Sequence, residues 1–174
     1  MVGYVSWGGG FIAHSTRFLF IIACCAQLVF HALPASANFG EPIASSGNWT
    51  VRRTLHAITD EPSCVAIYKD RFEIQLDEND LFVSLRGRGG VSSVVLRFDD
   101  HPAKELRPAS ETEKTTRAVN LCGREFEELM SSKRLRMQIR TTADTTIEED
   151  LDLSGVKEVH GEFMGSQCSG KVAR

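Results

Sequence analysis

Three cysteines, Cys64, Cys122 and Cys168, are the residues best suited to covalent chemistry once the apolar N-terminal segment is set aside. A catalytic or redox-active thiol needs a Cys-x-x-Cys pair or an activating histidine, and the sequence has no Cys-x-x-Cys pair. Three cysteines allow one intramolecular disulfide, with the pairings 64–122, 64–168 and 122–168 all open. We favour Cys64–Cys168, because Cys168 follows the last predicted helix and a bridge there would hold the C-terminus against an early strand. Cys122 is then free, or the alternative partner.

The histidines of the same region show no metal-ligand pattern. His56, His101 and His160 are isolated, without the His-x-His or His-Glu-x-x-His spacing of zinc sites. No Gly-x-Ser-x-Gly elbow of a serine hydrolase is present. We therefore predict no catalytic residue, no metal and no cofactor.

Two short segments begin like ligand loops and then depart from the pattern. Asp77–Asp80 starts like a calcium loop, but Leu81 and Phe82 stand where an oxygen ligand and a glycine are needed. Gly87–Gly90 is glycine-rich, yet no Lys-Ser or Lys-Thr follows it, as a phosphate loop requires. Both segments are better read as turns between strands.

Residues 1–37 differ from the rest of the chain, because Arg17 is their only charged side chain. The apolar run Phe18–Leu33 follows it, and Ala35-Ser36-Ala37 has the small-residue pattern of a cleavage site. A membrane-spanning helix needs about 20 apolar residues, more than this run provides. The pattern predicts a secretory signal peptide that is cleaved after Ala37.

A second processing route is open. Ile21-Ile22-Ala23-Cys24 resembles a bacterial lipobox, which would give an outer-membrane lipoprotein attached through a lipidated Cys24. Both routes deliver the protein to an oxidising compartment, the periplasm or the exterior. Contact with a membrane is expected only through the leader or through that lipid.

The remaining 137 residues contain 19 Lys and Arg against 23 Asp and Glu, a net charge of −4. This mild acidity gives no electrostatic reason to expect a nucleic-acid partner. A single domain of this size can bury a core without a structural metal. We predict a flexible lead-in over 38–47, one globular domain over 48–170 and a tail over 171–174.

Alternating apolar and polar residues predict a strand-rich α+β domain, a mostly antiparallel sheet or sandwich with two short helices and a disulfide. A hairpin is expected between the two helices, with strand 133–141 pairing with 146–153. The other predicted strands are 49–52, 64–68, 72–77, 81–85, 94–98 and 115–122, and the predicted helices are 125–132 and 156–167.

The hairpin carries a basic stripe whose neighbour is acidic. Outward positions of the first strand hold Arg134, Arg136 and Arg140, and those of the second hold Glu148, Asp150 and Asp152. Two registers keep the apolar residues together, one placing Arg136 opposite Asp150 and the other opposite Asp152. Either register gives a charge ladder rather than a polyanion site. Glu149 breaks the inward apolar pattern and is expected to mark an edge or a bulge.

Several segments together resemble the invasion-associated locus B family of small bacterial periplasmic proteins. They are the tryptophan strand Gly47–Val51, Cys64, the short helix headed by Phe126–Leu129, and Leu151–Gly155 before the final helix. An accessory protein of type VI secretion is similar in outline, with a cysteine after its last helix. The resemblance implies a secreted, disulfide-stapled, β-rich module acting at the envelope or the host interface.

The chain also departs from that family. Arg52 and Arg53 stand where the family tends to carry a cysteine soon after the tryptophan, and Val156 stands where it tends to carry an aromatic residue. No catalytic residue is carried over from the resemblance. We expect a non-catalytic module that binds a protein or an envelope component, with Arg86 and Arg88 as the first candidates for the partner contact. A small envelope hydrolase or thiol enzyme without a recognisable motif is the alternative.

Overall fold

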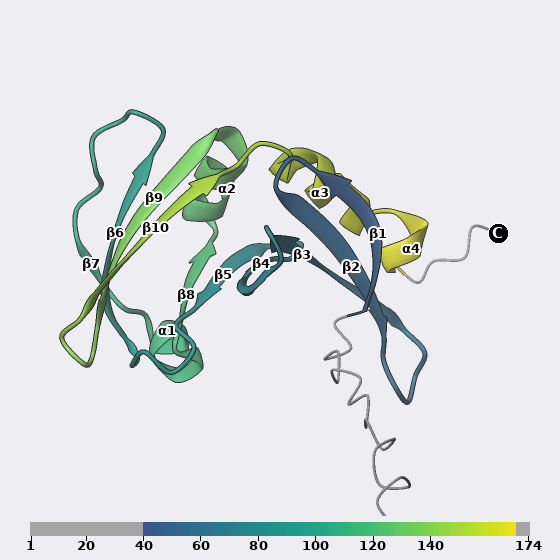
Figure 1. Ribbon diagram of the computed structural model, residues 1–174, viewed down its shortest axis with the longest axis horizontal. Helices are drawn as coiled ribbons and strands as arrows, with labels where there is room; N and C mark the ends of the chain where they lie inside the picture. The colour runs from purple at the N-terminus through teal and green to yellow at the C-terminus, as the bar shows by residue number, and fades with distance from the viewer. Residues whose placement is uncertain (1–39, 170–174) are drawn as a thin grey trace, which may run out of the picture. The chain divides into compact units, whose positions relative to one another are not determined.

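Strand pairing in this protein is antiparallel throughout residues 40–169, the part of the chain that the computed structural model describes (Figure 1). These residues belong to one compact unit. The predicted signal peptide, the lipobox and the predicted tail lie outside the described residues. No helix within residues 40–169 is long and apolar enough to cross a membrane.

The strands form two sheets, which confirms the predicted α+β architecture. The first sheet has the order β1-β2-β3-β4-β5-β8 and the second the order β10-β9-β6-β7. The first sheet contains β1 (Glu41–Ser46), β2 (Trp49–Leu55), β3 (Pro62–Tyr68), β4 (Arg71–Leu76), β5 (Asp80–Ser84) and β8 (Ala118–Cys122). The second contains β6 (Val91–Phe98), β7 (Arg107–Pro108), β9 (Arg134–Thr141) and β10 (Thr146–Asp152).

The predicted flexible lead-in over 38–47 is wrong for Glu41–Ser46, which form β1. This segment pairs with β2, from Glu41 opposite Arg53 to Ser46 opposite Trp49. Main-chain pairing outweighs the turn-like composition because Gly47, at φ +56°, lets the chain fold back directly onto β2. Gly47 is also required by space, since a Cβ there would lie 2.2 Å from the carbonyl oxygen of Ser154.

Four helices lie in the described region. They are α1 (Glu111–Thr116), α2 (Arg124–Ser131), α3 (Val156–Phe163) and α4 (Ser166–Ser169). The two predicted helices are present as α2 and α3, although the second ends at Phe163 and the chain resumes as the short α4 after Gly165.

Helix α1 was not expected, and it corrects the start of a predicted strand. We placed a strand over 115–122, but β8 begins at Ala118 because Thr115 and Thr116 belong to α1. Ser110 and Glu113 form a capping box in which each side chain accepts a hydrogen bond from the other's backbone N–H. This Ser-x-x-Glu pattern is visible in the sequence and is typical of a helix start.

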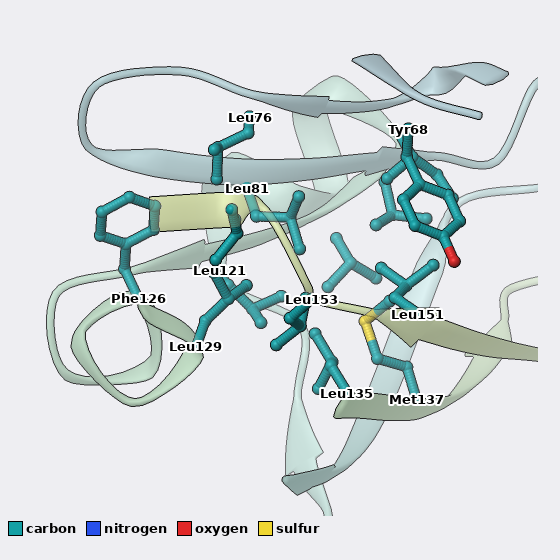
Figure 2. Close-up of a cluster of buried hydrophobic side chains, with 14 of the residues drawn as sticks. Tyr68, Leu76, Leu81, Leu121, Phe126, Leu129, Leu135, Met137, Leu151 and Leu153 are labelled. Carbon is teal, nitrogen blue, oxygen red and sulfur yellow. The ribbon is translucent and has the colours of Figure 1, made fainter. Parts of the chain in front are cut away.

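One hydrophobic core joins both sheets to the helices. In the close-up, Leu76, Leu81 and Leu121 of the first sheet face a cluster that includes Leu135 and Leu151 of the second (Figure 2). At the other end of the cluster, the buried rings of Trp49 and Tyr68 meet edge to face at 5.1 Å. Inward apolar positions at every second residue therefore produce the layers, as the alternation predicted.

The Cys64–Cys168 disulfide is present, as we predicted, and it joins β3 to α4 across a sequence separation of 104. Cys122 is left as an exposed free thiol. The bridge holds the last described helix against the first sheet.

The hairpin of β9 and β10 adopts the register in which Arg136 lies opposite Asp150 and Ile139 opposite Ile147. Pairing runs without interruption through Glu149, so the alternative of a bulge there is wrong. The alternative of an edge is confirmed, because β10 is the outer strand of its sheet. The Glu149 side chain points inward with the apolar residues and is buried.

Candidate functional site

Glu149 tolerates burial because Arg71 of β4 binds it. The two terminal guanidinium nitrogens of Arg71 donate to the two carboxylate oxygens at 2.9 Å each, while its Nε donates to Glu73. Glu73 also binds Arg86 at 3.0 Å. Burial alone would raise the pKa of Glu73, but the hydrogen bond from Arg71 and the nearby charges lower it. The Arg71–Glu149 pair joins the two sheets, and Glu73 holds Arg71 and Arg86 in place within the first.

A second buried acid, Glu113, is saturated in the same way. Arg107 donates to both of its oxygens at 2.8 and 3.0 Å, and the backbone N–H groups of Ser110 and Asn120 complete the shell. Arg107 also binds Glu125. Burial would raise the pKa of Glu113, yet these donors together lower it. Such a carboxylate is suited to fixing α1 against β8 and poorly suited to proton transfer.

The outward face of the second sheet carries a less balanced arrangement. Arg97 of β6 lies directly opposite Arg136 of β9, and like charges in such cross-strand positions repel. Arg97 donates from Nε to the His101 carbonyl at 2.8 Å, and Arg136 donates to the Asp99 carbonyl at 2.6 Å. These carbonyls carry no full charge, so the repulsion is only partly relieved.

The predicted charge ladder forms only in part. Arg134 binds Asp150, its diagonal neighbour on β10, and Gln138 donates to Glu148 at 3.3 Å. Arg136 faces Asp150 without a hydrogen bond to it, although its charge contributes to the lowered pKa of that carboxyl; the stronger contact of Asp150 is with Arg134. The only carboxylate within 4 Å of Arg136 in the described residues is the fully exposed Asp100, at 3.5 Å.

Arg97 and Arg136 line a concavity of about 480 Å³ on this face. Its floor includes Val95 and Gln138, which lie opposite each other on β6 and β9, and Ala103 and Glu148 contribute to its lining. The Nε atom of Arg136 is buried and has no hydrogen-bond partner. We call this region the outer-face concavity; its volume falls within the roughly 300–1,000 Å³ typical of ligand sites.

Neighbouring hollows extend this face. One of about 220 Å³ shares Val95 and Gln138 with the outer-face concavity and reaches the exposed Leu106. Another, wide open, shares Glu148 and is lined on its far side by Arg88. The concave part of the surface thus continues beyond the outer-face concavity in two directions.

Of the two arginines predicted to contact a partner, Arg86 has a structural interaction. Its guanidinium binds Glu73, although its side chain is 57% exposed. Arg88 donates from Nε to the Leu85 carbonyl and remains exposed. Their role in partner binding stays a prediction, and neither lines the outer-face concavity.

The sequence did not single out Arg97. Its alternation with the apolar Leu96 and Phe98 was visible, but its significance depends on β6 pairing with β9, a contact between segments about 40 residues apart. The stripe of β9 was read against β10 alone. On the other side of β9, the pairing with β6 places Arg97 opposite Arg136. Arg136 therefore has no bonded carboxylate on either neighbouring strand.

The free cysteine and the histidines are dispersed over the domain. Cys122 lies opposite Asp80 on β5, where a carboxylate does not activate a thiol as a cation does. His160 contacts the Glu78 carbonyl at 2.8 Å and packs beside Phe126. Within residues 40–169, no group of three or more histidine, cysteine, aspartate or glutamate side chains is placed to hold a metal ion.

Comparison with known proteins gives a weak structural similarity. No family model matches the chain, and no curated protein matches it. Among solved structures, the chain is similar to the crystal structure of invasion associated protein B from Bartonella henselae. Sequence identity is 12%, the similarity covers 71% of this chain and 95% of that chain, and the TM-score is 0.46. The resemblance noted in the sequence is thus supported as a weak structural similarity and not as family membership.

Proposed function

We propose that this protein is a non-catalytic binding module, exported to the periplasm or secreted, that binds a protein or an envelope component through the outward face of the β10-β9-β6-β7 sheet. The observation that carries the proposal is the Arg97–Arg136 pair at the outer-face concavity. Two opposed guanidinium groups with no bonded carboxylate on the adjoining strands form an arrangement that an oxyanion stabilises.

Two features support export. The leader has the charge, apolar run and small-residue site of a signal peptide. The Cys64–Cys168 disulfide is of the kind that persists in oxidising compartments. The leader and the disulfide were found independently, and both are expected of a periplasmic or secreted protein.

The use of the buried acids favours binding over catalysis. Glu113 and Glu149 are the buried carboxylates of the described region, and each is held by two or more hydrogen bonds from an arginine. A hydrolase that used either acid as its general acid or base would need it in contact with substrate and free to exchange a proton. Both acids instead stabilise contacts between elements.

Affinity capture from envelope extract tests the proposal. The exported protein is compared with Arg97→Gln and Arg136→Gln, and with Arg53→Gln as a control arginine on the first sheet that is already paired with Glu41. We expect the two test variants to lose the wild-type partner and the control to retain it. Equal capture by all four proteins would contradict the proposal.

A parallel arm tests the predicted contact at Arg86 and Arg88 with a double alanine variant. Loss of the same partner would extend the binding surface to that turn, and unchanged capture would remove the turn from it.

Mass spectrometry of the N-terminus of the exported protein tests which processing route it follows. A mature chain that begins at Asn38 supports signal-peptide cleavage after Ala37. A mature chain that begins at a lipidated Cys24 would show that the protein is processed as a lipoprotein.

A further inference from the structure

The outer-face concavity contains charges of both signs that form no ion pair within 4 Å with the adjoining strands of the described region. Arg97 bonds only to a carbonyl, and Arg136 has only the exposed Asp100 at 3.5 Å. Glu148 accepts a single hydrogen bond, from the uncharged Gln138. The concavity therefore has a positively charged side, formed by Arg97 on β6 and Arg136 on β9, and a negatively charged side, formed by Glu148 on β10.

We propose that the outer-face concavity binds a short zwitterionic peptide, with its terminal carboxylate on Arg97 and Arg136 and its terminal ammonium on Glu148; this rests on the proposed function and names its ligand class. Guanidinium groups bind carboxylates through paired N–H donors. An ammonium group would give Glu148 the charged partner that Gln138 does not provide.

The spacing fits a peptide of two or three residues. Arg136 faces Asp150, so Glu148 is its diagonal neighbour on β10. Diagonal neighbours in an antiparallel pair lie about 7–8 Å apart. An extended dipeptide or tripeptide, at about 3.3–3.6 Å per residue, spans this backbone separation. Long side chains can close such a gap, as Arg134 does to its own diagonal neighbour Asp150, so the volume of the concavity sets the upper length of the ligand.

The lining disfavours a more highly charged anion. Asp100 lies beside Arg136, and the concavity also contains Glu148 and Asp150. These carboxylates repel a dianion such as phosphate more strongly than they repel a single carboxylate. A zwitterion places its negative end away from Glu148 and its positive end near it. Charge complementarity therefore selects the zwitterion.

The rest of the concavity suits a small peptide body. Val95 and Ala103 offer apolar contacts, and the amide of Gln138 lies between the two charged ends. A volume of about 480 Å³ accommodates a few residues and not a folded domain.

Calorimetric titration of the full exported protein with Ala-Ala and Ala-Ala-Ala tests the proposal. We expect binding of at least one free peptide, weakened at least tenfold when its N-terminus is acetylated or its C-terminus is amidated. Inorganic phosphate should bind more weakly than that peptide. Equal binding of free and acetylated peptides, or preferred binding of phosphate, would overturn the assignment.

Variants locate the two ends of the ligand. Arg97→Gln and Arg136→Gln should lower the affinity for the free peptide at least tenfold, while Arg53→Gln, on the first sheet, should leave it unchanged. Glu148→Gln should lower the affinity for the free peptide and leave the affinity for the acetylated peptide unchanged, so that the two peptides bind equally well. An equal loss for both peptides in Glu148→Gln would overturn the placement of the ammonium group.

The outcome is separable from that of the capture experiment. If capture depends on Arg97 and Arg136 but neither peptide binds, the peptide assignment is wrong and the proposed function stands. If capture is also independent of both arginines, both proposals are wrong.

Discussion

Arg71 of β4 and Glu149 of β10 form a bidentate ion pair, with both terminal nitrogens of the arginine 2.9 Å from the carboxylate oxygens. This pair joins the two sheets beside their shared core. The hydrogen bonds that Arg71 donates to Glu149 are the main cause of the raised pKa of Arg71. An acid that breaks the apolar pattern of its strand therefore acts as a link between the sheets.

Replacing Glu149 with alanine should lower the free energy of unfolding by about 1.5–3 kcal/mol, the range for hydrogen bonds to charged groups. Asp150→Asn on the same strand is the control. Its ion pair with Arg134 is about half exposed, so we expect a loss of about 0.2–1 kcal/mol. Urea unfolding measures both variants. Equal losses would contradict a special role for Glu149.

The stability of the protein should fall in acid partly through Glu113. Its pKa is lowered from its ordinary value of 4.5 in the folded protein, so the unfolded chain binds the proton more readily. Its contribution is fully present above pH 4.5 and is lost as the pH falls through the folded-state pKa. Urea midpoints between pH 6 and 2.5 should fall less steeply in Glu113→Gln than in the wild type. Parallel curves would show that Glu113 contributes nothing to this dependence.

Reducing the Cys64–Cys168 bridge should cost about 2–5 kcal/mol, because the closed loop is long. Urea unfolding with and without reductant measures the difference. Cys64→Ser should reproduce the effect of the reductant, while Cys122→Ser should leave stability unchanged. A reductant effect that persists in Cys64→Ser would point to a different bridge.

The free thiol should be accessible in the folded protein. Because Cys122 is exposed and unpaired, a maleimide should label its tryptic peptide under native, non-reducing conditions. The peptides containing Cys64 and Cys168 should be labelled only after reduction. Peptide mass mapping reads both results, and native labelling at Cys64 would contradict the pairing.

The elements of the fold followed from local patterns. Alternation located the strands, and the inward parity of Ile139 and Ile147 limited the hairpin to two registers, one of which the structure adopts. Helix α1 was also visible in principle, because Ser110 and Glu113 have capping-box spacing. Strand β1 was not, since its Pro and Ser residues and the glycines that flank it are typical of a loop, and only pairing with β2 makes it a strand.

The candidate site depends on contacts that the sequence does not specify. Reading β9 against β10 alone suggested a neutral ladder, and the pairing of β6 with β9 brings Arg97 opposite Arg136. The partner of Glu149 was equally hidden, because Arg71 is 78 residues away in the chain. Pairing across such distances is determined by how the whole core packs and not by the local pattern.

The central claim is that the outward face of the second sheet is the binding surface. In-cell photo-crosslinking tests it most directly, with a photoreactive benzoylphenylalanine replacing the exposed Leu106 beside the outer-face concavity, or Ser45 on β1 as an exposed control on the first sheet. We predict a discrete adduct from position 106 that disappears in Arg97→Gln, and no adduct from position 45. An adduct from position 45 alone, or one at position 106 that persists in Arg97→Gln, would contradict a binding role for this face.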